Sequence, residues 1–240
     1  MYGIKCALSV LSLVSFLVVM LAQLLLSVAS APICAYGQTG CPLPTLADLF
    51  DRVMQQSSRM HGISSDLQSQ FEHYLFPSKN MLGKWKCHTH DILTPGNKQN
   101  AQNIDREQLT EVILRLLGAW GDPLSQLHQS MRQDHNKNHG RDFSHSSSNK
   151  ALEMSDVMQE LRDGVLKMAE KMKLQGAFSN AVAVVQPEEA RHSSAFAFYK
   201  RGTLSLLDHN DLLYCLRRDS DKVKNYLRIL QCSTLPGLEC

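Results

Sequence analysis

Apolar residues recur every three or four positions in four long stretches of the chain, which predicts four amphipathic helices. We place them at about residues 45–74, 105–134, 150–178 and 203–231. The last stretch has an apolar stripe of Leu213, Leu216, Val223, Leu227 and Leu230, with Ser220 as its one polar member. Its opposite side carries the charged residues Arg217, Arg218, Asp219, Asp221, Lys222, Lys224 and Arg228. Such a helix packs on one side and offers the other as scaffold or binding surface.

Local signals refine these helices. Thr45 followed by Asp48 is a capping pattern for the first helix. Pro123 lies inside the second stretch, where we expect a kink. Residues 135–149 are polar and low in complexity, which predicts a mobile loop. Gly164 lies inside the third helix, where glycine costs roughly 1 kcal/mol relative to alanine.

The connections between the four helices predict their order in space. They are about 30, 15 and 25 residues long, and only the middle one has a length that suits neighbouring antiparallel helices. Two long connections indicate crossover loops that climb the length of a bundle. The fold class expected is therefore all-α, an up-up-down-down four-helix bundle of the long-chain cytokine type.

The N-terminus has the pattern of a secretory signal peptide. Lys5 is the only charge in the first 47 residues, and Cys6 to Ala29 is nearly all apolar. Small residues follow, which predicts cleavage after Ser30, with residues 1–30 as signal peptide and 31–240 as the mature domain. The alternative is an uncleaved anchor, since a run of this length is able to span a membrane.

Secretion makes the six remaining cysteines candidates for three disulfides. Cys215 and Cys232 are roughly 25 Å apart if they share one helix, too far for a bridge. Turn-forming residues separate the other close pairs, so two short local loops are the economical choice. The expected disulfides are Cys34–Cys41, Cys232–Cys240 and, between the first crossover and the last helix, Cys87–Cys215.

Composition gives no support for catalysis. The net charge of +2 does not indicate a nucleic-acid partner, and the ten histidines match no structural zinc spacing. Nucleophile-elbow, phosphate-loop and zinc-protease motifs are absent from the sequence. We expect no enzyme activity, no cofactor and no metal. Lys200-Arg201 is either a dibasic processing site or a pair of solvated charges.

Several segments resemble the growth hormone/prolactin family. The strongest is the stretch from Cys215 to Cys232, and the others are Thr45–Arg52, Cys87-His-Thr, Trp120-Gly-Asp-Pro-Leu124 and Leu161-Arg-Asp-Gly164. The resemblance covers residues 32–240. The Cys34–Cys41 pair favours the prolactin branch, because growth hormones usually lack it.

The resemblance implies a secreted hormone, monomeric when free, that binds two prolactin-type receptor ectodomains and does not insert into the membrane. The first receptor site, carried over by position, consists of Val53, His61, Arg218, Asp221, Lys222, Tyr226 and Arg228. The second consists of Asp48, Asp51, Arg52 and Gly164. In this interpretation the missing side chain of Gly164 admits the receptor; the alternative is that it admits a neighbouring helix.

The chain departs from the family pattern at two positions, one on the first helix and one on the last. Ser58 and Asp221 stand where many prolactins carry histidines, so the resemblance gives only weak support for a histidine-driven loss of receptor binding at acidic pH, although His61 remains. Three other functions stay open: a receptor antagonist, a carrier of a small apolar ligand in the methionine-rich core, and a growth hormone-type ligand.

Overall fold

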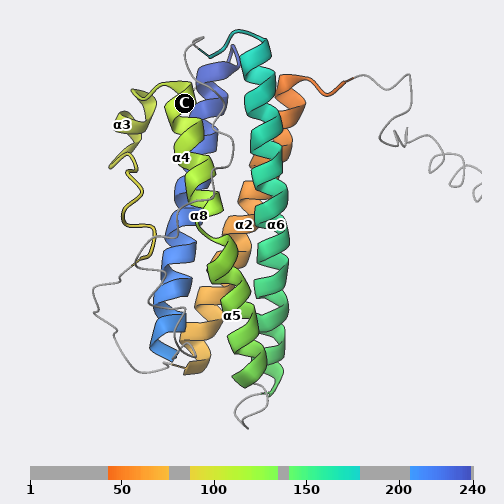
Figure 1. Cartoon of the computed structure of the whole chain (residues 1–240), viewed down its shortest axis with the longest axis vertical. Coiled ribbons are helices and arrows are strands. Elements are labelled where there is room, and N and C mark those ends of the chain that lie inside the picture. The colour runs from red at the N-terminus through yellow and green to blue at the C-terminus, as the bar shows by residue number, and fades with distance from the viewer. Residues whose placement is uncertain (1–42, 76–86, 135–140, 179–205, 239–240) are drawn as a thin grey trace, which may run out of the picture. The chain divides into compact units, whose positions relative to one another are not determined.

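The computed structural model describes residues 43–75, 87–134, 141–178 and 206–238. Contacts divide the chain into Met1–Leu43 and Pro44–Cys240, and every described helix belongs to the second unit. All regular structure in the described ranges is helical (Figure 1): α2 (Leu46–Leu75), α3 (Lys98–Gln102), α4 (Arg106–Gly118), α5 (Gly121–Asp134), α6 (Arg141–Leu174) and α8 (Leu206–Thr234).

The start of α2 is fixed by the capping pattern expected from the sequence. The Asp48 amide donates to Thr45 Oγ1 at 3.2 Å, and the Thr45 amide donates to Asp48 Oδ2 at 2.8 Å. This reciprocal pair satisfies two backbone donors that the first helical turn leaves without partners. The hydrogen bonds from Thr45 also hold the pKa of the Asp48 carboxyl below its usual value. The predicted helix start is confirmed.

Contacts between helices far apart in the sequence give their relative directions. In each pair of helices, the residue numbers rise along one helix as they fall along the other, so the two helices are antiparallel. Between α2 and α6 the contacts are Gln56 with Glu160 and Asp66 with Lys150, and between α2 and α8 they are Asp51 with Gln231 and Ser64 with Ser220. Between the α4 region and α8 they are Arg106 with Ser233 and Trp120 with Asp219. Helix α2 and the α4–α5 column therefore share one direction, and α6 and α8 share the other (Figure 1).

The core lies between these four columns and contains the apolar stripe of each. The largest fully buried side chains include Trp120, Phe50, Phe71 and Met60. All five apolar residues of the stripe predicted for the last helix are buried, and so is Ser220. Asp219, which the sequence analysis placed on the charged outer side, is buried as well, and that assignment was wrong.

The second helical stretch is interrupted, and the interruption lies before Pro123. Helix α4 ends at Gly118 and α5 begins at Gly121, so Pro123 occupies the first turn of α5. Proline is tolerated in a first turn because its missing N–H would have no intrahelical partner there. The expected kink at Pro123 is therefore a break between two helices at Ala119 and Trp120.

Two segments predicted to be irregular are helical. Helix α6 begins at Arg141, so the part of the polar segment from 141 to 149 is helix and not loop. Packing against α5 explains this, since Ser147 and Ser148 are buried and the His128 ring lies 2.9 Å from the Ser148 carbonyl oxygen. The first crossover also contains the short helix α3, whose amide at Asn100 is capped by the Asn97 side chain at 2.8 Å.

Two leucines on α6 test which face of that helix packs into the core. Leu161 is fully buried and Leu152 is 48% exposed. We expect Leu161→Ala to lower the free energy of unfolding by about 2–5 kcal/mol, because the substitution leaves a cavity. The matched change Leu152→Ala should cost under about 1 kcal/mol. Urea unfolding of both variants measures the difference, and equal losses would contradict the packing described.

Candidate functional site

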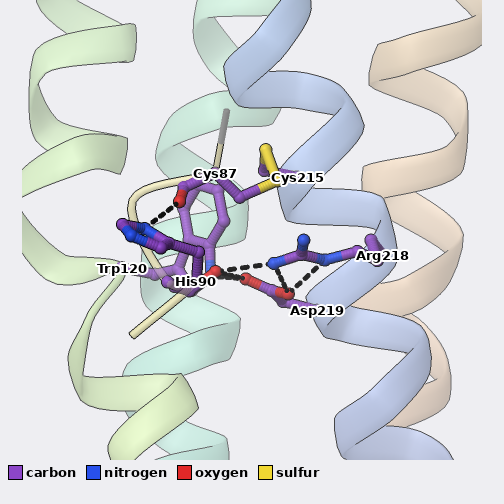
Figure 2. Close-up of a disulfide and its surroundings, with 7 residues drawn as sticks. Cys87, His90, Trp120, Cys215, Arg218 and Asp219 are labelled. Carbon is purple, nitrogen blue, oxygen red and sulfur yellow. Dashed lines mark hydrogen bonds and ion pairs between the residues drawn. A yellow bond between two sulfur atoms is a disulfide. The ribbon is translucent and has the colours of Figure 1, made fainter. Parts of the chain in front are cut away.

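A disulfide fastens the first crossover to the last helix. Cys87 and Cys215 are bonded with their Cα atoms 5.5 Å apart, and 128 residues separate them in the sequence. Figure 2 shows the bridge between the crossover segment and α8. This is one of the three pairings expected from the sequence. The other two involve residues outside the described ranges and stay predictions.

A buried carboxylate next to this disulfide joins three parts of the chain. Asp219 is 1% exposed. Its Oδ2 accepts a hydrogen bond from Thr89 Oγ1 at 2.6 Å and one from the Trp120 indole Nε1 at 3.2 Å. Its Oδ1 accepts from Arg218 Nε at 2.9 Å and from Nη2 at 2.7 Å (Figure 2). Both oxygens are thus satisfied, as a buried charge requires.

The break between α4 and α5 shapes the other side of this cluster. His88 is buried, and its ring lies edge-on to Trp120 with the ring centroids 4.5 Å apart. Its Nε2 lies 3.1 Å from the carbonyl oxygen of Ala119, so the neutral ring donates its N–H there. Burial lowers the pKa of His88, and the hydrogen bond to Ala119 opposes that change only in part. The crossover therefore presents a neutral imidazole to the core.

Two further side chains of α8 hold the crossover beyond Asp219. Lys222 Nζ donates to Thr94 Oγ1 at 2.9 Å, and the Tyr226 hydroxyl donates to the Pro95 carbonyl at 3.1 Å. Burial lowers the pKa of Lys222, with the Arg218 charge acting in the same direction. Burial also raises the pKa of Tyr226. Lys222 and Tyr226 therefore serve contacts inside the molecule, as Arg218 does.

The remaining residues carried over to the first receptor site lie in different surroundings. Val53 is 1% exposed, because it belongs to the apolar stripe of α2, and it offers no surface to a partner. His61 is half-buried, with Nδ1 3.2 Å from Ser220 Oγ on α8. Asp221 and Arg228 are exposed, and Asp221 Oδ2 accepts a hydrogen bond from Asn225 at 3.1 Å.

The exposed part of α8 is a narrow stripe next to the residues that hold the crossover. Its members are separated by three or four positions and all are exposed: Arg217, Asp221, Asn225 and Arg228. Residues at this spacing lie on one face of a helix. We refer to these four residues as the exposed stripe of α8. It carries two arginines and one aspartate, and its members Asp221 and Arg228 are the residues of the predicted first site that are exposed on the last helix.

Gly164 lies where α6 approaches α2 closely. A Cβ atom at Gly164 would lie 3.0 Å from Val53 Cγ1 and 3.4 Å from Gln56 Oε1. The first distance is shorter than ordinary van der Waals contact, so a side chain here requires α2 or Val53 to shift. The geometry supports the alternative in which the glycine admits a neighbouring helix. Gly164 is also partly exposed, so access for a partner is a second consequence of the same missing side chain.

The acidic and basic residues assigned to the second site divide between two edges of α2. Arg52 is exposed, and it lies one turn before Gln56, which donates to Glu160 of α6 at 3.3 Å. Asp51 instead faces α8, since its Oδ1 accepts from Gln231 at 3.5 Å. The Asp48 carboxylate is exposed and bound to Thr45 in the helix cap. Arg52 and Gly164 therefore lie toward the edge between α2 and α6, and Asp48 lies one turn before Arg52 on the same face of α2.

A polar cavity of about 360 Å³ lies at the opposite end of α4 from Trp120. It lies between the start of α4 and the last turn of α8, and the buried Glu107 Oε1 has no hydrogen-bond partner there. Within the described ranges, no three histidine, cysteine, aspartate or glutamate residues are grouped so as to hold a metal ion. In the same ranges no helix is long and apolar enough to cross a membrane.

The arrangement is that of a helical bundle whose last helix holds a crossover segment on its surface. The family model of the somatotropin hormones matches residues 16–240. The chain therefore belongs to the somatotropin hormone family. Its members are signalling ligands and not enzymes, so this protein is a receptor-binding hormone, and its partner is a cytokine-type receptor. Membership of a family of secreted hormones also indicates an extracellular location.

Three residues that hold the crossover in place were not predicted from the sequence: Thr89, Thr94 and Asp219. Thr89 and Thr94 carry no pattern that distinguishes them from loop residues. Asp219 did carry a signal, because it follows Leu216 by three positions and precedes Val223 by four, which places it on the buried stripe. Its charge led to the opposite assignment.

Removing the charge of Asp219 should destabilise the protein strongly. We expect Asp219→Asn to lower the free energy of unfolding by about 3 kcal/mol, because the half-buried Arg218 then loses its counter-charge. The comparison is Glu153→Gln, which breaks the exposed ion pair with Arg59, whose side chains are 44% and 56% exposed. That change should cost under about 1 kcal/mol. Equal costs in denaturant unfolding would contradict the structural role of Asp219.

The lowered pKa of His88 predicts that the free energy of unfolding decreases as the pH falls. The unfolded state binds a proton at His88 more readily than the folded state, so stability decreases as pH falls below about 6.5. We expect His88→Gln to reduce the slope of unfolding free energy against pH between pH 7 and 5, by at most about 1.4 kcal/mol per pH unit. The exposed His90→Gln controls for the loss of one titratable ring. An unchanged slope in His88→Gln would exclude this contribution.

Proposed function

We propose that this protein is a secreted hormone of the prolactin branch, which binds and dimerises a prolactin-type class I cytokine receptor through two faces. Residues 1–30 act as a signal peptide, and residues 31–240 form the hormone, which is a monomer when free. The two-up, two-down order of the helices supports the cytokine type of bundle, and the Cys34–Cys41 spacing supports the prolactin branch.

The first face consists of the exposed stripe of α8 together with the crossover segment beside it. The observation that carries the proposal is that the crossover segment is fixed to α8. A disulfide and hydrogen bonds from Arg218, Lys222 and Tyr226 hold these two distant parts of the chain together as one surface. A surface ordered before binding loses less conformational entropy on association. Arg217 and Arg228 make it basic, which favours a receptor surface with acidic residues.

The second face lies along the edge between α2 and α6, where Arg52 and Gly164 are accessible. In the proposed complex the first receptor binds the α8 face and the second binds this edge. In this proposal Asp48 contributes mainly by capping α2, and Asp51 contributes mainly through its hydrogen bond with Gln231 of α8. The two faces lie on different helices, so two ectodomains are able to bind one hormone.

Titration of the purified protein against receptor ectodomains tests the proposal. We expect a 2:1 complex with a prolactin-type ectodomain, measured by calorimetry together with light scattering. Preference for a growth hormone receptor ectodomain would move the assignment to that branch. A complex that stops at 1:1 would indicate an antagonist, and no binding to either ectodomain would overturn the proposed function.

Substitution of Gly164 tests the second face. We expect Gly164→Arg to keep 1:1 binding and to lose the 2:1 complex, because the arginine side chain covers the edge between α2 and α6. The glycine also lies against Val53, so a shift of α2 is a competing cause for the same loss. Sedimentation with excess ectodomain measures the stoichiometry.

A second substitution separates the two causes. Val53→Ala removes the methyl group that would lie 3.0 Å from a Cβ atom at position 164, so Gly164→Arg in that background no longer needs α2 to move. If the arginine blocks the receptor directly, the double variant stays at 1:1. If the shift of α2 is responsible, the double variant regains the 2:1 complex, which would contradict Gly164 as a receptor contact. Val53→Ala alone is the control.

A further inference from the structure

One apolar side chain in the crossover segment is almost fully exposed although the backbone on both sides of it is fixed. Leu93 is 89% exposed. Ile92, immediately before it, packs against the core and donates its amide to the Thr89 carbonyl at 3.1 Å. Thr94 and Pro95, immediately after it, accept hydrogen bonds from Lys222 and Tyr226. The side chain of Leu93 is therefore exposed to solvent on a backbone segment that contacts with α8 fix in position.

The fixing contacts form a continuous row on α8. Cys215, Arg218, Lys222 and Tyr226 follow one another at spacings of three and four, and in that order they contact Cys87, Thr89, Thr94 and Pro95. The row and the segment thus run side by side, and neither Lys222 nor Tyr226 directs its polar group outward. A single exposed leucine is ordinary on a protein surface. One held in a fixed position beside a basic stripe is suited to insertion into a pocket of a partner.

We propose that Leu93 is the principal apolar contact of the first receptor face, and that Arg218, Lys222 and Tyr226 are positioning residues that act by holding its segment. The inference rests on the proposed function. The occupant is the ectodomain of the cytokine-type receptor, and the chemistry expected of it is an apolar pocket for Leu93 with carboxylates beside it for the exposed stripe of α8. Leu93 is accessible without any rearrangement of the core, so its substitution tests binding and not folding.

The direct test is the affinity of Leu93→Ala for the receptor ectodomain in the 1:1 complex, measured by surface plasmon resonance on the full mature chain. We expect a loss of about tenfold or more, as for a central interface anchor. Leu174→Ala is the matched control, because Leu174 is 78% exposed at the end of α6 and has no part in either face. Both variants should unfold at the same denaturant concentration as the parent protein.

The positioning role is tested by a double-mutant cycle. Tyr226→Phe removes only the hydroxyl that binds Pro95, and we expect it to lower receptor affinity about threefold. If Tyr226 acts through the segment, its effect shrinks in the Leu93→Ala background, whereas a direct receptor contact keeps its full effect. Hydrogen exchange gives a second readout without receptor: amides of residues 90–97 should exchange faster in Tyr226→Phe than in the parent.

The outcomes distinguish this inference from the function on which it rests. If the parent binds and Leu93→Ala binds within twofold of it, Leu93 is not the anchor and the inference is overturned, while the proposed function stands. Additive effects in the cycle, or unchanged exchange of residues 90–97, overturn the positioning role. If the parent binds no receptor ectodomain, both the proposed function and this inference fail.

Discussion

The buried carboxylate of Asp219 is the interaction on which the candidate receptor face depends. A single side chain of α8 accepts hydrogen bonds from the crossover through Thr89, from the break between α4 and α5 through Trp120, and from its neighbour Arg218. A buried charge is costly unless all its partners are in place, so it favours one arrangement over others that bury similar apolar area. The disulfide joins only the crossover and α8, whereas the carboxylate also binds the break between α4 and α5.

The sequence predicted the long-range architecture well where it follows from periodic patterns. The apolar stripes and the Thr45 cap depend on spacings of three and four residues or on one local motif, and the all-helical class follows from those stripes. The segment 141–149 was assigned to a loop because of its polar composition. Its helix is stabilised by contacts with α5, and single-sequence propensity carries no information about such contacts.

The site was less predictable than the fold, for a related reason. Asp219 and Thr89 are 130 residues apart, and no local spacing connects them. Lys222 and Tyr226 have side chains typical of an exposed binding face, yet the structure uses them within the molecule. Gly164 shows a similar ambiguity, because one missing side chain both brings α2 close to α6 and leaves the edge between them accessible. The type of a residue indicates which interactions its side chain is able to make, but only the fold determines whether it makes them inside the molecule or with a partner.

The order of the helices also has a consequence for biosynthesis. Helix α2 packs mainly against α6 and α8, the last two long helices to leave the ribosome. Its apolar stripe therefore has no native cover until most of the chain has been translated. Cys87 likewise has no native partner until Cys215 has been translated, and Cys34 and Cys41 precede both in the sequence. Because Cys215 lies in α8, the native Cys87–Cys215 disulfide forms only after the start of this last long helix has been translated.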